Sequence, residues 1–465
     1  METTGNPAGN AGHSNGGVPE LSRSLRARHV TMISIGGIIG AGLFVGSSAA
    51  IVAAGPAVVL SYVIAGGLMY LVMRMLGELA LAHPGTRAFT DFPRFAFGRL
   101  AGFTTGWLYW YFWVVVVPIE AIAGARILHQ WVTVPEPAIG LVLVAAMTLV
   151  NLMSTRMYGE FEFWFASIKV AAIMVFVLLS LAWVLGLGRA PGTETAVAAM
   201  AAPGGFAPYG AGAVLAAVTT VFFSLTGAEI TTVAAAESAE PGKQLARLSA
   251  AVIVRILFFY VASLALIVCV LPWKSVVPGQ SPFSDAMQHM GYSWATTALK
   301  VVILTAVLSC LNSAFYVTSR VLFALAAAGD APKALVKLNA TQVPTRSVWV
   351  CAIAGVIGIL VSVGKAAKVF AFLVSASGAL IVFVYLLVAL AQWRLRSRRD
   401  PAAQAANPAP MPWHPWLSLV AVAGMALVLV AMAAAPARRE ELLASVAALA
   451  VILVAGFISR PRSRG

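Results

Sequence analysis

The chain has 465 residues, of which 60% are hydrophobic and 10% are charged. A soluble globular protein carries about 25% charged residues, and a disordered or fibrous protein needs a polar bias or a strict repeat, so the composition excludes these classes. The net charge is +14, but the basic residues lie in short loops and form no extended face for a nucleic acid. The composition therefore predicts a polytopic membrane protein.

Long apolar stretches recur along the whole chain. A crossing helix needs about 20 apolar residues, and these stretches lack the period-two alternation of barrel strands, so we expect twelve transmembrane helices. The stretches are residues 30–53, 57–80, 102–128, 137–153, 163–186, 211–236, 252–271, 296–325, 348–363, 369–392, 414–434 and 442–458.

The distribution of basic residues predicts the orientation of these spans. Of the 31 Lys and Arg residues, 20 fall on the side that holds both termini and seven fall in the opposite loops. Under the positive-inside rule the first side is cytoplasmic. We therefore expect a multi-pass protein of the cytoplasmic (inner) membrane, with cytoplasmic tails at 1–29 and 459–465 and a cytoplasmic linker at 394–413.

The linker separates the last two spans, in residues 414–458, from a core of ten spans in residues 30–393. Residues of about 30–186 and 211–393 each contain five spans, and an odd number inverts the second unit relative to the first. A five-plus-five inverted repeat is the recurring architecture of secondary transporters. The predicted fold is therefore an all-α membrane protein with an inverted repeat and two additional C-terminal helices.

Two spans at corresponding positions of the two units contain helix-disfavouring residues. Gly36–Gly46 in the first span holds five glycines, each of which costs about 1 kcal/mol in a helix. Close helix packing through Gly36 and Gly40 is one interpretation; because glycine lies on several faces at once, unwinding is the other and the one we favour. The sixth span has Gly227 within Phe222–Glu229, and paired interruptions point to a binding site.

An unwound segment frees backbone N–H groups at one half-helix and carbonyls at the other, which suit a carboxylate and an ammonium. The pattern therefore predicts a small zwitterionic amino acid, with its carboxylate at the amides of Gly40–Gly42 and its ammonium near the carbonyls of Ile38, Phe223 and Thr226. Selectivity would come from neighbouring spans, with Ser375 as one candidate. The predicted substrate-binding residues are Ile38, Gly40, Ala41, Gly42, Glu120, Phe223, Ser224 and Thr226.

Motifs in both halves carry a family resemblance over residues of about 25–395. They are Arg28–Met32, Gly36–Gly46, Gly55–Ala57, Met73–Glu78, Gly106–Trp110, Tyr158–Trp164, Gly227–Glu229, Ala235–Ser238, Ser309–Ser313 and Gly329–Pro332. The chain resembles amino acid transporters of the amino acid–polyamine–organocation (APC) superfamily, which implies a LeuT-like arrangement of the inverted repeat. Within that superfamily it is most similar to the bacterial GABA permeases, and the residues that carry this similarity are 46–48, 127–129 and 236–238. The loop at 84–94 departs from the family pattern, which puts family details of the gate in doubt.

Ionisable residues inside membrane spans are costly and are functional candidates by default. Lys169 lies eight residues after Phe161 in the fifth span, so it is too deep to reach either interface easily. It is either a structural tie between helices or, as the resemblance implies, a replacement for the sodium ion of sodium-coupled relatives, which makes the chain a proton symporter. Predicted hydrogen-bond partners in the eighth span are Ser309, Asn312 and Ser313.

Other side chains have a functional and a structural interpretation. Glu120, two residues after Pro118, would line the cavity or transfer protons, or else form a neutral helix–helix hydrogen bond. Glu229 would either take part in gating or link the interrupted helix to its neighbours. Phe223 would cover the occupied site. Arg74 and Glu78 are spaced for an ordinary ion pair. Interfacial anchoring is the interpretation for most of an aromatic cluster: Trp107, Tyr109, Trp110, Tyr111 and Trp113.

Other classes of function fit less well. A membrane enzyme would need a nucleophile with its base or a metal motif, and a channel would favour rings of carbonyls or charges; a nutrient sensor would usually add a soluble domain. We therefore expect a secondary transporter, not an enzyme, that imports an amino acid with protons by alternating access, without cofactor, metal, ATP or nucleic acid. GABA is the favoured substrate, and an aromatic, basic or proline-type α-amino acid is the alternative.

Overall fold

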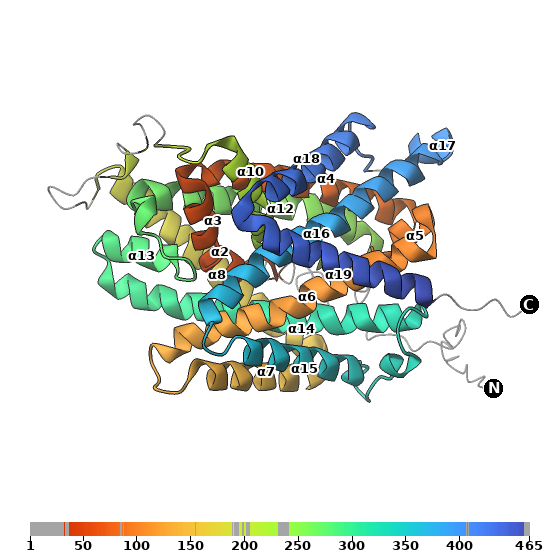
Figure 1. Ribbon diagram of the computed structural model, residues 1–465, viewed down its shortest axis with the longest axis horizontal. Helices are drawn as coiled ribbons and strands as arrows, with labels where there is room; N and C mark the ends of the chain where they lie inside the picture. Colours follow the sequence, from red (N-terminus) through yellow and green to blue (C-terminus); the bar gives the residue numbers. More distant parts are fainter. Residues whose placement is uncertain are drawn as a thin grey trace, which may run out of the picture.

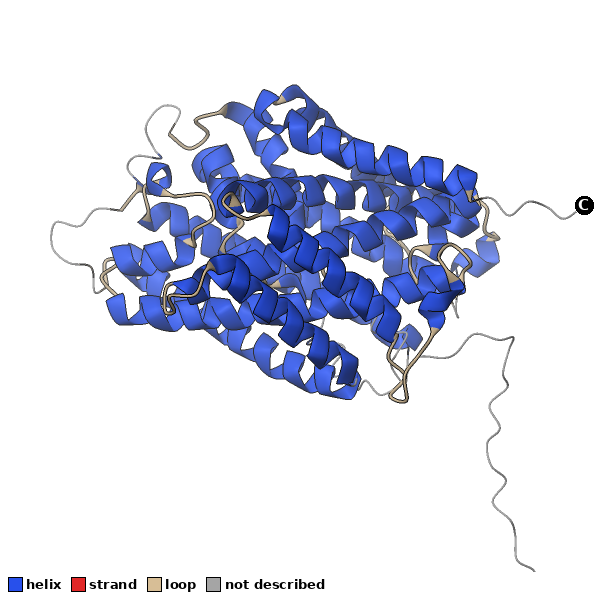
Figure 2. Ribbon diagram, turned by 60° about the horizontal axis from the view of Figure 1, so that its bottom comes forward, coloured by secondary structure: helices blue, strands red, loops and turns tan. Residues whose placement is uncertain are grey.

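The apolar stretches of the sequence form helices throughout the described part of the chain. The computed structural model describes residues 32, 37–83, 86, 88–153, 155–187, 189, 195–197, 200, 205–230, 241–405, 407 and 409–459. Within these residues the regular elements are α-helices and short 3-10 helices, without a β-strand (Figures 1 and 2). The all-α prediction is confirmed. The motif at 235–238, Gly36 and the N-terminal tail lie outside the described residues.

The first part of the chain supplies helices of very different lengths. They are α2 (Ala41–Phe44), α3 (Ser47–Ala54), α4 (Val58–Ala82), α5 (Asp91–Phe97), α6 (Arg99–His129), α7 (Glu136–Met153), α8 (Thr155–Val184) and α10 (Gly210–Leu225). The second part supplies α12 (Pro241–Val270), α13 (Pro282–His289), α14 (Ser293–Ala327), α15 (Thr345–Val361), α16 (Ala366–Ser397), α17 (Pro401–Ala405), α18 (Trp416–Ala434) and α19 (Arg439–Ile458).

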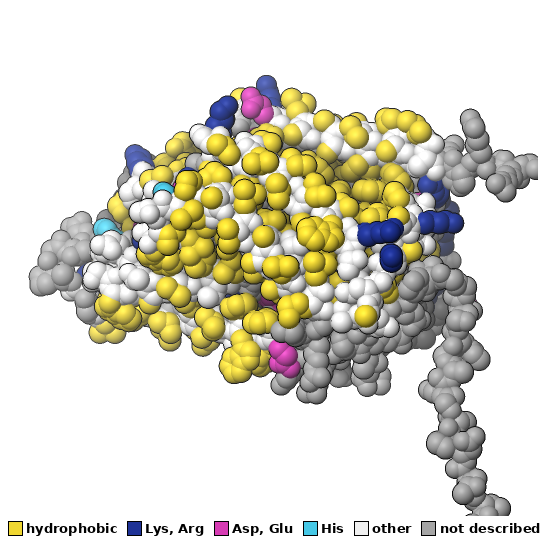
Figure 3. Space-filling view, turned by 90° about the horizontal axis from the view of Figure 1, so that it is seen from below, with side chains coloured by type: hydrophobic (Ala, Val, Ile, Leu, Met, Phe, Trp, Pro, Cys, Tyr) yellow, Lys and Arg dark blue, Asp and Glu magenta, His cyan; other side chains and the backbone are white. Residues whose placement is uncertain are grey.

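Several of these helices are suited to a lipid environment. Among the described residues, eight segments are long and apolar enough to cross a membrane, and three shorter apolar helices lie at Gly210–Leu225, Leu257–Val270 and Thr345–Val361. Figure 3 shows a face covered mainly by hydrophobic side chains, with Lys and Arg near its margins. Val142 of α7 and Ile353 of α15 are exposed although they are aliphatic. A membrane-spanning bundle explains this surface; the count of twelve spans stays a prediction.

The longest helices form the centre around which the interrupted segments lie. Helix α6 packs along α14, and both run lengthwise through the molecule (Figure 1). Helix α10 packs against α4 and α16, while α12 packs against α4. The short segment α2 contacts α10, α6 and α14 together. This arrangement brings the two glycine-containing segments to the middle of the bundle.

One predicted ion pair is wrong. Arg74 and Glu78 were expected to pair along α4, but Glu78 accepts hydrogen bonds from Gln392 (2.9 Å), Arg396 (3.2 Å) and the backbone N–H of Met411 (2.9 Å). Arg74 donates instead to the carbonyl of Pro410 (3.0 Å). The reason is the tertiary packing: a buried carboxylate is better satisfied by three converging donors than by one half-buried neighbour on its own helix.

Candidate functional site

The glycine-rich segment interrupts its helix at a defined place. Gly37 and Ile38 are helical, Ile39 and Gly40 are not, and α2 begins at Ala41. Gly40 is extended, with φ −140° and ψ −151°. A Cβ atom at Gly40 would lie 2.6 Å from Cβ of Cys310 and 2.9 Å from Oε1 of Glu120. Only glycine therefore lets α14 and α6 approach this backbone so closely.

The first free N–H of α2 is bound by a carboxylate from another helix. Glu120 of α6 accepts a hydrogen bond from the N–H of Ala41 with both oxygens, at 3.2 and 3.1 Å, and is 1% exposed. Its position follows from α6, which continues through Pro118 to His129. The amide that is predicted to bind a substrate carboxylate thus already binds the carboxyl group of a side chain, so a carboxyl group fits this position.

The second interruption lies at the end of α10. The helix stops at Leu225, Thr226 is extended, and Gly227 has φ +127°, a conformation that side chains disfavour. A Cβ atom at Gly227 would lie 2.7 Å from the carbonyl oxygen of Gly37. The two interrupted segments are therefore in direct backbone contact.

A further hydrogen bond joins these segments. The hydroxyl of Ser224 donates to the carbonyl of Gly42 at 2.7 Å. The hydroxyl of Tyr260, from α12, donates to the carbonyl of Ile38 at 3.0 Å. The carbonyls left by the interruption are thus accessible to donors, as an ammonium site requires, and the carbonyl of Ile38 already has one.

A small cavity lies where these elements converge. Its volume is about 10 Å³, room for about one water molecule. It is lined by Gly37, Ile38, Gly40, Gly42, Phe112, Trp113, Val116, Glu120, Phe223, Thr226 and Cys310. Six of the eight predicted substrate-binding residues line it, and Ala41 and Ser224 hydrogen-bond to its walls. An amino acid fits here only if the surrounding helices move apart.

Lys169 has partners on its own helix and on α14. The side chain is fully buried, its ammonium donates to Ser309 at 2.8 Å, and it lies 3.8 Å from Oε1 of Glu162. The Ser309 hydroxyl donates in turn to Glu162. Of the other predicted partners, Asn312 accepts a hydrogen bond from Asn151 at 2.7 Å, and Ser313 is fully buried one helical turn beyond Ser309. Lys169, Ser309 and Glu162 form one buried cluster.

Glu229 is held by three elements. It accepts hydrogen bonds from the hydroxyls of Tyr109 on α6 (3.1 Å) and Tyr385 on α16 (2.9 Å) and from the N–H of Gly227 (3.1 Å). The interpretation of the aromatic cluster as interfacial anchors is wrong for Tyr109 and Trp113, which are 0% and 1% exposed. Tyr109 is turned inward because its hydroxyl satisfies a buried carboxylate.

Three functional side chains were missed in the sequence. Glu162 lies seven residues before Lys169 and therefore on the same face of α8, a spacing that could have predicted the pair. Tyr385 and Cys310 had no comparable signal, because their contacts come from other helices. Ser375 lies away from the cavity: it is 3.3 Å from the hydroxyl of Thr220, and Arg438 donates to it at 2.5 Å.

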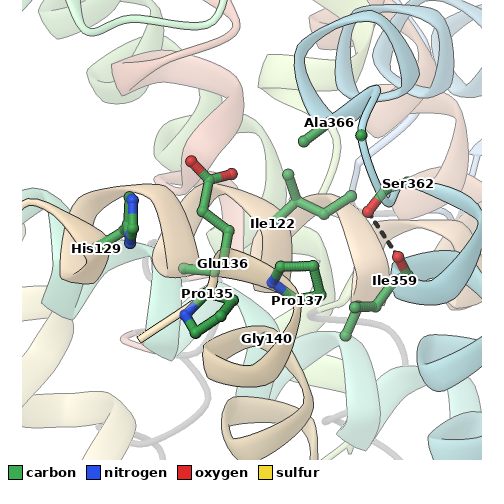
Figure 4. A pocket seen from close by; sticks show the side chains of 11 residues that line it. Ile122, His129, Pro135, Glu136, Pro137, Gly140, Ile359, Ser362 and Ala366 are labelled. Carbon is green, nitrogen blue, oxygen red and sulfur yellow. Dashed lines mark hydrogen bonds between the residues drawn. The ribbon is translucent and has the colours of Figure 1, made fainter. Parts of the chain in front are cut away.

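Two larger cavities open near one end of the bundle, with volumes of about 360 and 400 Å³. Figure 4 shows the first, which lies between the α6–α7 connection and the end of α15. Both cavities are lined by His129 and Glu136. In the second, burial raises the pKa of Asp285, and the positive charge of Lys300 opposes that shift.

The opposite end carries an ion cluster. Asp330, just beyond α14, is ion-paired with Arg94 of α5 and lies 3.3 Å from Arg99. Trp107 donates to its carbonyl at 3.1 Å. Arg94, at the end of the unusual loop at 84–94, thus belongs to this ion cluster; Pro84, Gly85 and Arg87 lie outside the described residues.

Comparisons with known proteins agree on one family. The family described as amino acid permease matches residues 29–460. The gamma-aminobutyric acid permease of Bacillus subtilis (strain 168) is 39% identical, with 95% of this chain and 94% of the relative covered. The gamma-aminobutyric acid permease of Escherichia coli (strain K12) is 42% identical, with 92% and 91% covered. An aromatic amino acid transport protein of Corynebacterium glutamicum is 35% identical, with 94% of each covered.

The fold has counterparts among solved structures. The crystal structure of a manganese transporter from Eremococcus coleocola matches with a TM-score of 0.60 at 13% sequence identity, and 93% of each chain is covered. At this identity the likeness concerns the fold alone.

Proposed function

The chain belongs to the amino acid permease family, and on this premise we propose that it imports a small amino acid across the cytoplasmic membrane by proton symport and alternating access. GABA is the proposed substrate. The observation that carries the proposal is the meeting of two interrupted helices at one small cavity, beside a carboxyl group that is hydrogen-bonded to the first amide of a helix.

The proposed topology has twelve spans in a five-plus-five inverted repeat with two additional helices, and both termini are cytoplasmic. The non-helical Ile39 and Gly40, and the end of α10 at Leu225, support the interruption of the first and sixth spans. The excess of basic residues on one side supports the orientation.

We place the substrate carboxylate at the start of α2 and its ammonium among the carbonyls of Ile38, Phe223 and Thr226. An incoming carboxylate meets Glu120 at the amide of Ala41. An ionised Glu120 repels the substrate carboxylate and also competes with it for the hydrogen bond from the N–H of Ala41. A proton on Glu120 removes the negative charge and lets the substrate take the amide. Substrate and proton would therefore bind together, which is the requirement for symport.

The cluster of Lys169, Glu162 and Ser309 provides the second proposed element of coupling. Ser309 precedes Cys310, whose side chain lines the small cavity, so the protonation state of the cluster acts next to the substrate. The ion pair also compensates two charges whose separate burial would be costly. We propose that Lys169 links proton movement to the opening of the site, with Glu162 as its counter-charge.

The relatives and the cavity both favour GABA over an aromatic amino acid. The GABA permeases are 39% and 42% identical to this chain, against 35% for the aromatic transporter. The rings of Phe112, Trp113 and Phe223 already fill the walls of the cavity. A narrow, unbranched substrate displaces less of this packing than an aromatic one does.

The test is uptake of labelled GABA into vesicles that contain the purified protein. We expect uptake to rise with an inward proton gradient, and unlabelled GABA to compete better than phenylalanine, lysine or proline. Absence of gradient-dependent uptake across this panel would contradict proton symport. Stronger competition by another amino acid would contradict the GABA assignment alone.

The coupling cluster has its own test in the variant Lys169→Met. We expect loss of net proton-driven uptake by about 100-fold, because a buried charge pair is broken, while exchange of internal for external GABA persists. A pH-sensitive dye inside the vesicles measures the proton movement. Unchanged proton uptake with substrate in Lys169→Met would show that Lys169 has no part in coupling; Lys300→Met, in the distant cavity near the bundle end, is the control.

A further inference from the structure

An arginine from the C-terminal helix pair reaches two helices of the transporter core. Arg438 ends the short 3-10 helix Pro436–Arg438 between α18 and α19, which lie over α10 and α16 (Figure 1). Its Nη1 atom donates to the hydroxyls of Thr220 on α10 (2.8 Å) and Ser375 on α16 (2.5 Å). Thr220 and Ser375 are 0% and 3% exposed. One guanidinium thus binds both members of a pair of packed core helices, at a point where their two hydroxyls lie 3.3 Å apart.

The bridge is unusual because both acceptors are neutral. Guanidinium groups inside proteins usually pair with carboxylates, which match their geometry with two hydrogen bonds. Among the described residues no carboxylate oxygen lies within 4.0 Å of Arg438; Glu441 acts on it only through its charge. A contact between a cation and two hydroxyls can break without leaving a second buried charge unpaired.

The bridge lies next to the candidate substrate site. Thr220 precedes Ser224 by four residues, which is about one helical turn. Ser224 donates to the carbonyl of Gly42, and Phe223 lines the small cavity. Widening this cavity requires α10 to shift against its neighbours, and the bridge from Arg438 holds α10 against α16 one turn away.

We infer that Arg438 is a positioning residue that clamps α10 to α16 while the site is closed and must release them before the site opens toward the outer side. The inference deepens the proposed function and rests on it. It assigns to the two C-terminal helices, which lie outside the inverted repeat, control over access to the substrate cavity.

Cys310 supplies a readout that needs no substrate. Its side chain lines the small cavity and is 5% exposed. In a Cys269→Ala, Cys351→Ala background, the rate at which a membrane-impermeant thiol reagent labels Cys310 from outside measures outward opening. Arg438→Met should raise this rate roughly tenfold, as expected for losing hydrogen bonds to a charged group. Thr220→Val and Ser375→Ala should each raise it less, and not additively with Arg438→Met.

Arg439→Met is the matched control. Arg439 follows directly in the chain and is exposed, and within the described part of the chain its one hydrogen bond runs to the carbonyl of Ala433 at 2.9 Å. In Arg439→Met, the rate at which the reagent labels Cys310 should equal the rate in the Cys269→Ala, Cys351→Ala background. Arg438→Lys should restore part of the closure, because an ammonium can still bond to a hydroxyl.

Transport provides a second readout in the same variants. A released clamp should lower the KM for external GABA and lower the maximal rate, because closure becomes slower, whereas a folding defect lowers only the maximal rate. Unchanged labelling in Arg438→Met, Thr220→Val and Ser375→Ala would overturn the inference; if Arg438→Met does not fold, the two hydroxyl variants decide it. Faster labelling of Cys310 in these variants, without any amino acid uptake by the original protein, would support the role of Arg438 and contradict the proposed transport function instead.

Discussion

Each of the two interrupted segments has a glutamate on a backbone N–H, but the two glutamates are held differently. Glu120 comes from α6, 79 residues along the chain, and binds the N–H of Ala41. Glu229 lies two residues from the amide it binds, that of Gly227, and is also fastened by Tyr109 and Tyr385. The first glutamate bridges two helices through one amide, and the second is tied to three elements.

This difference suggests that the hydrogen bond of Glu120 can be exchanged for another partner, whereas the hydrogen bonds of Glu229 cannot. In the proposed mechanism a substrate carboxylate takes the place of Glu120, because the same amide can bind either carboxyl group. Nothing that passes through the site can replace Glu229, whose donors are side chains of the scaffold and its own segment. We therefore expect Glu120 to change partners during transport and Glu229 to keep the end of α10 in place.

The largest expected effect comes from the backbone at the fixed interruption. In Gly227→Ala, a methyl group would lie 2.7 Å from the carbonyl oxygen of Gly37, at a residue with φ +127°. Strain of this kind costs about 1–3 kcal/mol before the clash is counted. We expect uptake to fall by more than about 100-fold, since each 1.4 kcal/mol is a factor of ten.

The control for this variant is Gly212→Ala in α10, the helix that ends just before Gly227. A methyl group at Gly212 meets no atom within 4 Å, so uptake and melting temperature should stay at their original values. Retention of full uptake in Gly227→Ala would mean that the two interrupted segments are not tightly packed during transport.

The next effect tests the anchoring of Glu229. In Glu229→Leu the hydroxyls of Tyr109 and Tyr385 and the N–H of Gly227 lose an acceptor, and each unsatisfied buried donor costs about 1–3 kcal/mol. We expect uptake to fall by about 100-fold, as the lower end of this cost for three donors implies, and the melting temperature to drop. Glu229→Gln keeps an acceptor oxygen and should recover much of both. If the leucine variant were as active and stable as the original protein, Glu229 would not be an anchor.

A smaller effect, of a different kind, is expected at Glu120. Glu120→Gln cannot ionise, so the opposition to the substrate carboxylate disappears at every pH. We expect the maximal rate of proton-driven uptake to fall roughly tenfold, which is less than the roughly 100-fold or more that a proton-transfer group contributes to a chemical step. We also expect uptake to depend less on external pH. The measurement is GABA uptake between acid and alkaline external pH. Glu229→Gln should keep the original pH profile; a flattened profile there and not in Glu120→Gln would reverse the assignments.

The sequence predicted the elements of the site better than their contacts. The glycines of 36–46 and Gly227 indicated interruptions because glycine disfavours a helix, and the structure has non-helical residues at Ile39–Gly40 and Thr226. Lys169 was recognisable because an ammonium deep in an apolar helix needs a partner, and Ser309 is one of those predicted. Both features depend on a residue and its neighbours in the chain, so they can be recognised in the sequence alone.

The partners that were missed come from helices far apart in the chain. Tyr385 reaches Glu229 across 156 residues, and no periodicity within either helix records that contact. Glu78 was assigned to Arg74 because only the same helix was considered, whereas α16 and the linker supply its donors. Tertiary packing decides which of several polar residues meet, and a single sequence does not contain that choice.

The smallest effect is expected when only one of the three hydrogen bonds to Glu229 is removed. Tyr385→Phe removes one hydrogen bond of 2.9 Å to the carboxyl group of Glu229, and a typical hydrogen bond contributes about 1 kcal/mol net. The bonds from Tyr109 and Gly227 remain, so we expect uptake within about fivefold of the original, with a slightly lower melting temperature and an unchanged pH profile. Tyr111→Phe, on an exposed part of α6, is the control and should alter neither. A loss of uptake in Tyr385→Phe as large as in Glu229→Leu would mean that the carboxylate depends on one contact, and Glu229 would then be as replaceable as Glu120.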